Sequence, residues 1–324
     1  MGDKIAPVDV AAIVVNYRTP DLTIACVESL LAATGVAIGV IVVDNASGDD
    51  SVDRVGAHFR HRPPVMVVAR DVNDGYAGGN NAGVAVARQL GARYAFVLNS
   101  DTIIDSSCLR LLVDEAERDA RTALVTPRIF LGDPPDRLWL GGGRYSLWHG
   151  RPIHVGRNGP ASAGWTDTSD LPFASGCALL IKLSAVAGDP FDASLFSYAE
   201  DLDLSIRVRR QRRGIRYVPH AVVWHFEGTS HRREGGQALR FYLNTRNLLR
   251  VNGRHARWYH WPTLAPMLAV DVLGRFSAVA ARDRNWDAFA AVWRGALHAF
   301  TGGRAAIEPL DPRNVAAASS NTRS

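Results

Sequence analysis

Cysteine is scarce in this chain of 324 residues, and its three copies show no metal-ligand spacing. Cys26, Cys108 and Cys177 stand singly and far apart in the sequence. The pattern argues against a cysteine-bound metal ion and indicates a reducing compartment. We therefore expect each thiol to be a small core side chain rather than a reactive group.

Segments for targeting or for crossing a membrane are also missing from the pattern. Residues 1–4 lead directly into an apolar block without the layout of a signal peptide. No uncharged run reaches the roughly 18 residues that span a bilayer. We therefore expect a cytoplasmic protein that is soluble or, at most, peripheral on the inner face of the membrane.

The known glycine-rich phosphate loops are absent as well. The segment Asn73–Asn81 contains Gly75, Gly78 and Gly79, but it matches neither GxGxxG nor the Walker loop. A dinucleotide or ATP site of those types is therefore disfavoured. We expect this segment to be a loop that offers flexible backbone amides and opens a helix reaching Leu90.

What the chain does contain is an alternation of apolar runs and helical patterns. With 47% hydrophobic and 21% charged residues, it can bury a sizeable core, as one large domain or as a core domain with an appendage. Strands are predicted at Val10–Val15, Gly39–Val43, Val65–Ala69 and Tyr94–Leu98. A helix capped by Asp21 is predicted after the first strand. This order predicts an α/β fold with a parallel sheet covered by helices on both faces.

Polar side chains stand where three of these strands end. Asn16, Asp44 and Asp101 follow directly on apolar runs. Because parallel strands place their carboxyl ends at one edge of the sheet, we expect these side chains to converge. A carboxylate at that edge can hold a divalent cation, which in turn recruits phosphate. Each of these acids taken alone is also compatible with a solvated turn.

Beyond the fourth strand the pattern is less regular. Residues Arg128–Pro172 are rich in Gly, Pro and Trp and indicate a functional insertion or a lid. Strands are predicted at Ala178–Ile181, and then as two runs at Ile215–Val218 and Ala221–Trp224. Between them, Phe196–Arg207 alternates like a strand, whereas its arginine-rich end favours a helix.

The C-terminal part is apolar and basic. Gln237–Val251 predicts a helix, and Trp258–Phe300 forms either a helical hairpin or an amphipathic surface for a membrane or a partner. Ten arginines stand against three aspartates between Gln237 and Arg304, a balance compatible with nucleic acid, anionic lipid, a phosphorylated ligand or a solvated face. We expect a catalytic domain at 1–236, a helical region at 237–308 and a disordered tail at 309–324.

Seven short blocks occur in one order along the chain: Val14–Tyr17, Val42–Ser47, Asn73–Asn81, Leu98–Asp101, Ala174–Cys177, Phe196–Arg207 and His225. In these blocks the sequence resembles the inverting nucleotide-sugar glycosyltransferases of family 2. The resemblance implies a GT-A fold, that is, a mostly parallel twisted sheet with helices on both faces, here with a C-terminal helical extension. The Arg246-Asn247 pair resembles the rhamnosyltransferase-like branch.

The resemblance also implies a role for each block. The nucleotide and sugar of a dTDP- or UDP-linked donor would be held by Asn16, Tyr17, Arg18, Asp44, Asn45, Tyr76, Asn80, Asn81, Asn99 and Ser100. Asp101 and His225 would bind Mg²⁺ or Mn²⁺. Asp201, beside Glu200, would be the general base. The acceptor or the diphosphate would be contacted by Trp139, Ser175, Gly176, Arg246 and Asn247.

Two departures from the family pattern qualify this interpretation. The metal motif is often Asp-x-Asp, but the first position here is Asn99, so the phosphates of the donor would supply more of the cation's ligands. The Gln/Arg-x-x-Arg-Trp motif of processive polysaccharide synthases is missing, which implies transfer of single sugars.

The ionisation of Asp201 is subject to two opposed effects. If a helix begins here, its N-terminal dipole favours the carboxylate. Burial beside Glu200 has the opposite effect. The alternative role for this acidic pair is helix capping, that for His225 is structural, and that for Arg246 is a solvated or supporting one.

The favoured hypothesis is an inverting transferase that moves one sugar, foremost L-rhamnose from dTDP-rhamnose, to a polyprenyl-diphosphate-linked saccharide or another cell-surface glycan. A UDP-sugar donor and a small natural-product acceptor stay open, as do a homodimer and a peripheral membrane contact. Two alternatives are a sugar-phosphate nucleotidyltransferase and a non-catalytic sugar- or nucleic-acid-binding protein. The first would need a basic glycine-rich signature that Val10–Pro20 lacks. No nucleic-acid module is recognised, so we expect no nucleic-acid partner.

Overall fold

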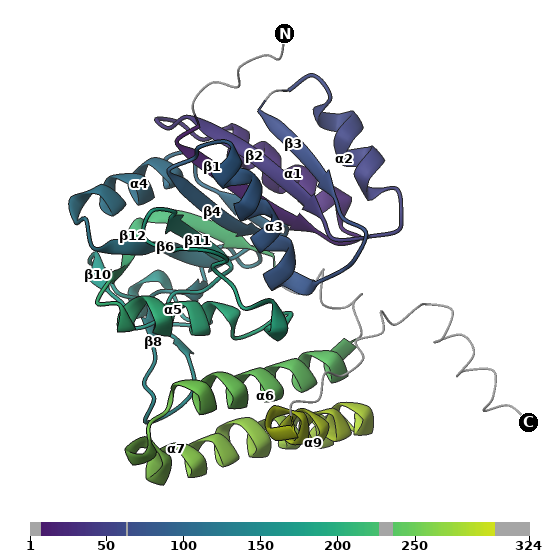
Figure 1. Ribbon diagram of the computed structural model, residues 1–324, viewed down its shortest axis with the longest axis vertical. Coiled ribbons are helices and arrows are strands. Elements are labelled where there is room, and N and C mark those ends of the chain that lie inside the picture. Colours follow the sequence, from purple (N-terminus) through teal and green to yellow (C-terminus); the bar gives the residue numbers. More distant parts are fainter. Residues whose placement is uncertain (1–7, 63, 227–235, 302–324) are drawn as a thin grey trace, which may run out of the picture. The chain divides into compact units, whose positions relative to one another are not determined.

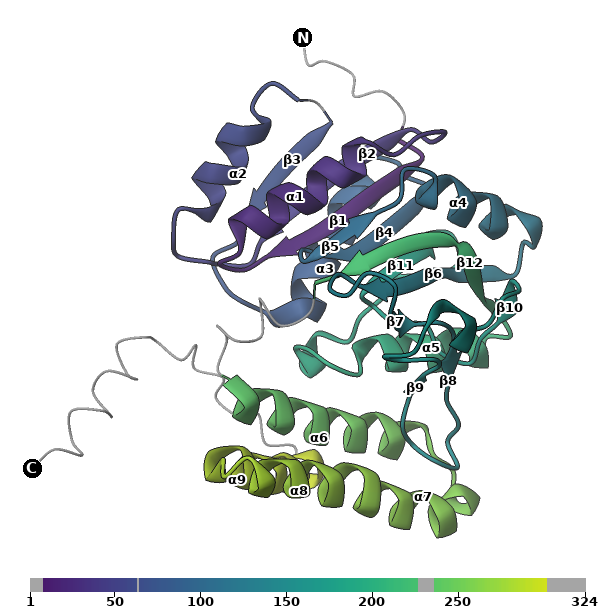
Figure 2. The same ribbon diagram turned by 180° about the vertical axis from the view of Figure 1, so that it is seen from behind.

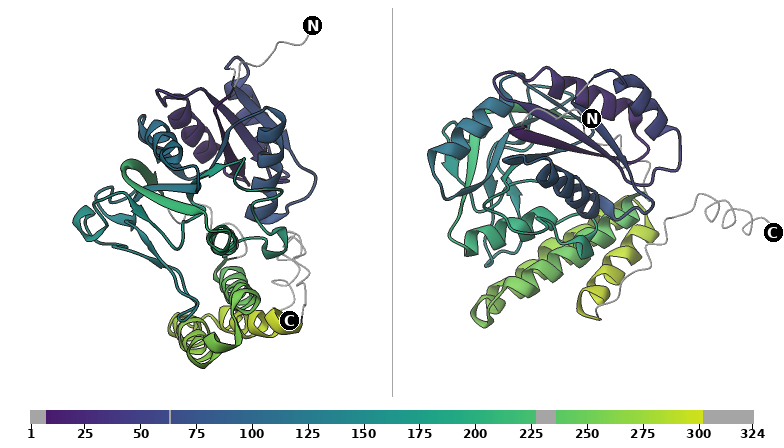
Figure 3. Two further views of the ribbon diagram at one scale, coloured as in Figure 1. Left: turned by 60° about the vertical axis from the view of Figure 1, so that its left-hand side comes forward. Right: turned by 45° about the horizontal axis from the view of Figure 1, so that its top comes forward.

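A computed structural model describes residues 8–62, 64–226 and 236–301 (Figures 1, 2 and 3). The chain divides into two compact units, Met1–Ser230 and His231–Ser324. The tail expected at 309–324 lies outside the described residues.

A ten-stranded sheet forms the centre of the first unit. Eight strands follow one another in the order β10-β12-β6-β11-β4-β1-β2-β3, with β5 beside β12 and β7 beside β6. Their bounds are β1 Val10–Asn16, β2 Ile38–Asp44, β3 Val65–Ala69, β4 Tyr94–Asn99, β5 Thr102–Ile104, β6 Thr122–Leu131, β7 Leu138–Leu140, β10 Ser169–Asp170, β11 Ala178–Lys182 and β12 Gly214–His225.

The sheet is mixed, and its parallel part carries the predicted strands. β1 pairs in parallel with β2 and β4, β2 with β3, and β6 with β12. β11 is antiparallel to both β4 and β6 and separates the two parallel groups. The predicted mostly parallel α/β fold is confirmed, with an antiparallel strand at its centre that the apolar runs did not reveal.

Helices cover both faces of this sheet. α1 (Pro20–Leu31), α2 (Ser51–Phe59) and α4 (Cys108–Arg118) pack with one core cluster, which includes Val10 and Phe96. α3 (Gly75–Gln89) and α5 (Glu200–Arg210) pack with the other, which includes Ile13 and Val97. Alternate residues of β1 and β4 point to opposite clusters, so both faces of these strands are buried and their sequences are continuously apolar.

Two details of the predicted helices are corrected. Thr19, and not Asp21, is the N-cap of α1, because Pro20 occupies the first helical turn, where a missing N–H costs nothing. The glycine-rich segment is not a loop, since α3 already begins at Gly75. A Cβ at Gly79 would lie 2.9 Å from Val15 Cγ1, and one at Gly83 would clash with Ile13. These glycines therefore allow α3 to pack closely on β1.

The irregular segment predicted at Arg128–Pro172 begins later than expected, because β6 continues to Leu131. Pro127 lies inside this strand, opposite Val218 of β12, where a register shift interrupts the pairing. A proline cannot donate to its neighbour, and a bulge accommodates that loss. The two runs expected at Ile215–Val218 and Ala221–Trp224 are parts of the single strand β12. A small sheet of β8 (Gly143–Arg144) and β9 (Ile153–His154) lies within the remaining insertion.

The ambiguous segment after Phe196 is resolved as the helix α5. Its N-cap is Ala199, in the left-handed region with φ of 65°, and no side chain caps it. An ion pair between Arg207 and Asp203 at 2.7 Å supports one turn of the helix. Leu202 and Leu204 alternate in sequence, yet both are buried because α5 is packed around much of its circumference.

The second unit is helical, as predicted. It contains α6 (Gly236–His255), η3 (Trp258–His260), α7 (Trp261–Leu268), η4 (Ala269–Gly274), α8 (Arg275–Arg282) and α9 (Trp286–Thr301). Phe241 of α6 stacks on Phe276 of α8 with ring centroids 5.1 Å apart. Gly295 lets α9 approach α6, because a Cβ there would lie 2.6 Å from the Tyr242 carbonyl oxygen.

One continuous helical stretch in this unit, Trp258–Arg282, is long and apolar enough to cross a membrane. It has 25 residues and a mean hydropathy of 1.5, and 22% of its apolar window is buried. Asp271 and Arg275 interrupt this stretch, so it contains no uncharged run of the length that spans a bilayer. The match rests on length and composition alone, which core helices of soluble proteins also satisfy.

Candidate active site

Asn16 and Asp44 stand side by side at the carboxyl ends of β1 and β2. Asn16 Nδ2 donates to Asp44 Oδ1 at 2.7 Å. Ser47 donates to the same carboxylate twice, from its hydroxyl at 2.6 Å and from its backbone N–H at 3.0 Å. A carboxylate offers about four acceptor sites, so Asp44 is fixed in orientation with one site left.

Tyr17 and Arg18 form the turn that follows β1. Arg18 has φ of 57°, and its guanidinium lies 5.1 Å from the centroid of the Tyr17 ring. Arg18 donates from its backbone N–H to the Ser47 hydroxyl at 2.9 Å and from Nε to the Ser47 carbonyl at 2.8 Å. The turn after β1 is thus fastened to the turn after β2, next to Asp44.

Asn45 and Asn81 are engaged with the protein itself. Asn45 donates to Asn73 and to the Gly75 carbonyl and accepts from Arg70. Asn81 exchanges two hydrogen bonds with the backbone of Phe191. These bonds give both amides a supporting role, and their predicted contact with the donor stays a prediction.

Asp101 and His225 meet beyond the ends of β4 and β12. The antiparallel pairing of β5 with β12 places His225 opposite Thr102. His225 Nε2 lies 3.1 Å from Asp101 Oδ1 and 3.5 Å from Asn99 Nδ2. Trp139 packs edge-on against His225, with ring centroids 4.9 Å apart. The structure therefore brings together four residues that the sequence assigned to metal, nucleotide and acceptor.

Asp101 and His225 are both buried, and the surroundings of His225 shift its pKa. Burial lowers the pKa of His225, but the neighbouring Cys177 sulfur and Asp101 carboxylate outweigh burial and raise it well above its ordinary value. Among the described residues His225 Nδ1 has no hydrogen-bond partner. A carboxylate and an imidazole would fit as two donors for a divalent cation, which would displace the additional proton of His225 when it binds.

Across residues 8–62, 64–226 and 236–301, no group of three or more His, Cys, Asp or Glu side chains is arranged to hold a metal ion. Asp101 and His225 alone do not complete a coordination sphere of six. A cation at this pair would therefore need oxygen ligands from another molecule, and a diphosphate supplies such oxygens.

Asp201 lies in the first turn of α5, against the segment that precedes β11. Its Oδ2 accepts from the Gly176 N–H at 2.9 Å, and its Oδ1 accepts from the Leu202 N–H at 2.7 Å. Tyr76 Oη donates to the Gly176 carbonyl at 2.6 Å. Asn80 Nδ2 in turn donates to the Tyr76 carbonyl at 2.8 Å. Gly176 thus joins Tyr76 of α3 to Asp201 of α5.

Glu200 and Asp201 differ in their surroundings, and this difference affects the pKa of each carboxyl group. Burial raises the pKa of Asp201, while the N–H groups of Gly176 and Leu202 oppose this rise. Burial, and then the charge of Asp201, raise the pKa of Glu200 well above its ordinary value. Within the described part of the chain Glu200 Oε2 accepts no hydrogen bond. Because Asp201 accepts two backbone N–H groups, its surroundings favour the charged form more than those of Glu200 do.

A continuous series of contacts links the three aspartates at the carboxyl edge of the sheet. It runs from Asp44 through Asn16, Thr19 and Ser100 to Asp101, and on through His225, Asn99, Cys177 and Gly176 to Asp201. The link from β4 to the Gly176 segment is the Asn99 N–H, which donates to the Cys177 carbonyl at 3.0 Å. Ser175 accepts from the Cys177 N–H in the same turn. The ends of β1, β2 and β4 thus lie at one edge of the sheet, as expected, and the joint role of the three aspartates stays a prediction.

Sequence reasoning missed the residues that support this series. Thr23 donates to Asn16 Oδ1 at 2.8 Å, Ser47 ties Asp44 to Arg18, and Arg70 holds Asn45. Serine and threonine are too common to be singled out by type. The sequence offered only their positions as a sign of this role: Thr23, for example, lies one helical turn after Thr19.

Arg246 and Asn247 belong to α6 of the second unit. Arg246 Nε donates to Asn247 Oδ1 at 2.8 Å, and its guanidinium lies 5.4 Å from the Tyr242 ring centroid. Both side chains are buried. Their predicted contact with an acceptor or a diphosphate stays a prediction.

Comparison with solved structures identifies the fold. The fold is similar to GalNAc-T7, solved with UDP, GalNAc and Mn²⁺, at a TM-score of 0.62 and 14% identity over 85% of this chain and 54% of that one. It is also similar to the mannosyltransferase PcManGT of Pyrobaculum calidifontis, solved with GDP-Man and Mn²⁺, at a TM-score of 0.57 and 15% identity over 93% and 90% of the two chains. The predicted GT-A fold is confirmed.

The chain belongs to glycosyltransferase family 2, whose model, described as glycosyl transferase family 2, matches residues 11–178. It is 36% identical to the succinoglycan biosynthesis protein ExoO of Rhizobium meliloti over 109 residues, which cover 34% of this chain and 30% of that protein. It is 25% identical to the N-acetylglucosaminyl-diphospho-decaprenol L-rhamnosyltransferase of Mycobacterium tuberculosis over 264 residues, 72% of this chain and 81% of that protein. The match thus spans about a third or less of the first curated relatives. Membership of this family disfavours the nucleotidyltransferase and binding-protein alternatives.

Proposed function

We propose that the protein transfers a single sugar, with inversion, from a dTDP- or UDP-linked donor to a hydroxyl of a lipid-diphosphate-linked saccharide or another cell-surface glycan. The observation that carries the proposal is the unbroken series of contacts from Asp44 through Asp101 to Asp201. L-rhamnose is the preferred donor sugar, because the relative that matches most of this chain is named as an L-rhamnosyltransferase.

The donor's nucleoside would bind beside Asp44, where one acceptor site remains for a base N–H or a ribose hydroxyl. Arg18 and Tyr17 would border it. The diphosphate would lie toward Asp101 and His225, which would hold Mg²⁺ or Mn²⁺ with it. The two solved structures named above contain Mn²⁺, which supports a divalent cation as part of the proposal. When bound, such a cation neutralises charge on the leaving diphosphate.

Asp201 would act as the general base. The acceptor oxygen forms its bond to the anomeric carbon as the bond to the diphosphate oxygen breaks, and the acceptor proton passes to Asp201. A single displacement of this kind inverts the anomeric configuration. Glu200, whose pKa is raised by burial and by the Asp201 charge, would be neutral and would add no second negative charge beside the base.

The donor assignment predicts selective stabilisation by one nucleotide. With uridine and thymidine diphosphates and their sugars, with and without Mn²⁺, the matching ligand should raise the free energy of unfolding by about 2.7 kcal/mol at a hundredfold excess over its Kd. Asp44→Asn should abolish this rise, whereas Asp53→Asn, an exposed acid on α2, should retain it. The measurement is a thermal-shift series in which each variant is compared with its own ligand-free state. Equal stabilisation of both variants would remove Asp44 from the donor site.

We also propose that the second unit contacts the inner face of a membrane, where a lipid-linked acceptor is found. Its surface exposes large apolar side chains, among them Trp258 at 83%, Phe300 at 76% and Trp286 at 66%. Tryptophans of this kind settle at the headgroup level of a bilayer. The ten arginines counted from Gln237 to Arg304 add attraction to anionic lipid.

Membrane contact predicts that vesicle binding depends on these tryptophans. Trp258 and Trp261 are three residues apart at the start of the apolar helical stretch, so they share one side of it. Replacing both with serine should weaken binding to vesicles that contain phosphatidylglycerol by about tenfold. Trp148→Ser, which removes an exposed tryptophan of the first unit, should change little. Co-sedimentation measures this, and a double variant that binds like the wild type would contradict the membrane contact.

A further inference from the structure

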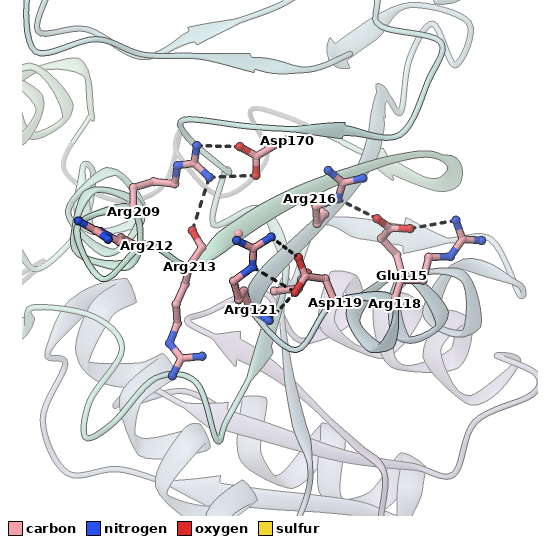
Figure 4. A pocket seen from close by; sticks show the side chains of 11 residues that line it. Glu115, Arg118, Asp119, Arg121, Asp170, Arg209, Arg212, Arg213 and Arg216 are labelled. Carbon is pink, nitrogen blue, oxygen red and sulfur yellow. Dashed lines mark hydrogen bonds and ion pairs between the residues drawn. The ribbon is translucent and has the colours of Figure 1, made fainter.

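A cavity of the first unit lies at the opposite edge of the sheet from the candidate active site. It is found where β6 and β12 begin and where α4 and α5 end, and its volume is about 560 Å³ (Figure 4). β12 starts at this cavity with Gly214 and reaches the candidate active site with His225. A volume of this size is typical of pockets for small ligands.

Arginine dominates the lining of this cavity. The guanidinium groups come from Arg118, Arg121, Arg209, Arg212, Arg213 and Arg216. The carboxylates come from Glu115, Asp119 and Asp170. The formal balance is three positive charges in excess, in a space partly shielded from water. Nothing in the proposed transfer reaction uses this edge of the sheet.

Each carboxylate of the cavity is already paired. Arg216 Nε donates to the buried Glu115 at 2.8 Å, Arg209 meets Asp170 at 2.7 Å and Arg121 meets Asp119 at 3.1 Å, as the dashed lines of Figure 4 show. Arg118 approaches Glu115 as well, at 3.5 Å. The acids thus hold several guanidinium groups in place at the wall.

Arg212 and Arg213 are the two arginines of the lining that are not paired with a carboxylate of the cavity. Within the described residues neither guanidinium contacts a carboxylate, and Figure 4 marks no interaction at either group. Arg213 is half-buried. Guanidinium groups without a counter-anion repel one another and gain when an anion enters.

The helix dipoles at this edge oppose the arginines but do not cancel them. α4 and α5 both end here, and each C-terminus contributes roughly half a negative charge. Together they offset about one of the three excess charges. About two positive charges remain, which is near the charge of a diphosphate group.

We infer that this cavity binds a phosphate-bearing anion, held by the unpaired forks of Arg212 and Arg213 beside the fixed arginines. The planar guanidinium fork matches the spacing of phosphate oxygens and binds them through two parallel hydrogen bonds. The phosphate comes either from a soluble diphosphate compound or from a lipid headgroup. This inference is independent of the proposed transfer reaction.

The test uses inorganic pyrophosphate as the probe and a readout that is local to the cavity. Phenylglyoxal modifies accessible arginines, and mass spectrometry maps the modified positions. Pyrophosphate should slow the modification of Arg212 and Arg213 at least fivefold. It should leave the modification rate of Arg60, an exposed arginine that does not line the cavity, unchanged. Equal rates with and without pyrophosphate would overturn the inference.

Affinity provides the second measurement. Arg212→Gln with Arg213→Gln should weaken pyrophosphate binding at the cavity at least tenfold in calorimetric titrations. The matched control, Arg60→Gln with Arg137→Gln, removes the same charge from exposed positions of the first unit and should bind as the wild type does. If both double variants weakened pyrophosphate binding equally, the loss would reflect net charge alone, and the inference would be overturned.

Vesicles distinguish the two sources of phosphate. If the Arg212/Arg213 double variant loses affinity for phosphatidylglycerol vesicles relative to the control pair, the ligand is a headgroup. If it loses affinity for pyrophosphate alone, the ligand is a soluble diphosphate. Both outcomes support a phosphate site, and neither depends on whether the protein transfers sugar.

Discussion

Replacing Asp201 with asparagine is expected to lower the rate of sugar transfer by about 10²–10⁴-fold, the usual contribution of a general base. Asparagine keeps the shape of the side chain and can still accept from the Gly176 and Leu202 N–H groups. It cannot take the proton of the acceptor hydroxyl. Since the fold is largely preserved, donor affinity should change little, and steady-state rates with separately measured donor binding check this.

Glu200→Gln is the matched control for that substitution. Burial and the Asp201 charge raise the pKa of Glu200, which favours its neutral form. Glutamine imitates that neutral state, so we expect transfer within about tenfold of the wild type. A large loss for Glu200→Gln together with a small loss for Asp201→Asn would exchange the roles of the two residues. Retention of activity within about tenfold in Asp201→Asn would remove it as the base.

The pH profile follows from the same assignment. Burial raises the pKa of Asp201 above the 3.8 of an ordinary aspartate, so the carboxylate becomes protonated earlier as the pH falls. Activity should therefore decline on the acid side at a higher pH than an exposed aspartate would give. The acid limb should disappear in Asp201→Asn, whose residual rate has no such base to titrate.

The second large effect is expected at Asp101. Asp101→Asn should reduce transfer on the order of 10³-fold, because a cation that neutralises the leaving diphosphate is worth several kcal/mol. The amide keeps the size of the side chain beside His225 but is a weaker cation ligand than the carboxylate. Removal of divalent cations with a chelator should inhibit the wild type to a similar degree, and Mn²⁺ or Mg²⁺ should restore it.

The control for this substitution is Asp71→Asn, since Asp71 is exposed. That variant should keep both its rate and its response to the chelator. Donor hydrolysis or transfer, followed by release of nucleoside diphosphate, serves as the measurement. A wild-type rate that is insensitive to the chelator, with an active Asp101→Asn variant, would separate Asp101 from any cation.

The parts of the fold that the sequence predicted well are those where one physical signal dominates. β3 was predicted at its observed bounds because five apolar residues lie between turn-forming residues. β6 was missed because Pro127 interrupts it, and only the register shift of the neighbouring strand accommodates that proline. The direction of β11 could not be predicted, because a short apolar run looks the same in a parallel and in an antiparallel strand.

The candidate site shows the same division. Asp44 and Asp101 were predictable, because strand ends in parallel sheets converge whatever their distance in sequence. The contact of Asp201 with Gly176 was not, since it depends on where α5 begins and on the left-handed Ala199 before it. The glycine-rich start of α3 was misjudged as a loop because glycine disfavours helices in isolation, whereas here it admits the side chains of β1.

The buried Glu200 makes folding of this protein a proton-uptake reaction. Its pKa in the folded state lies above its value in the unfolded chain, so the native form binds more protons than the unfolded form between those two pKa values. Across that window stability falls as the pH rises. A buried acid of this kind thus costs the native state stability as the pH rises above the pKa of the same group in the unfolded chain.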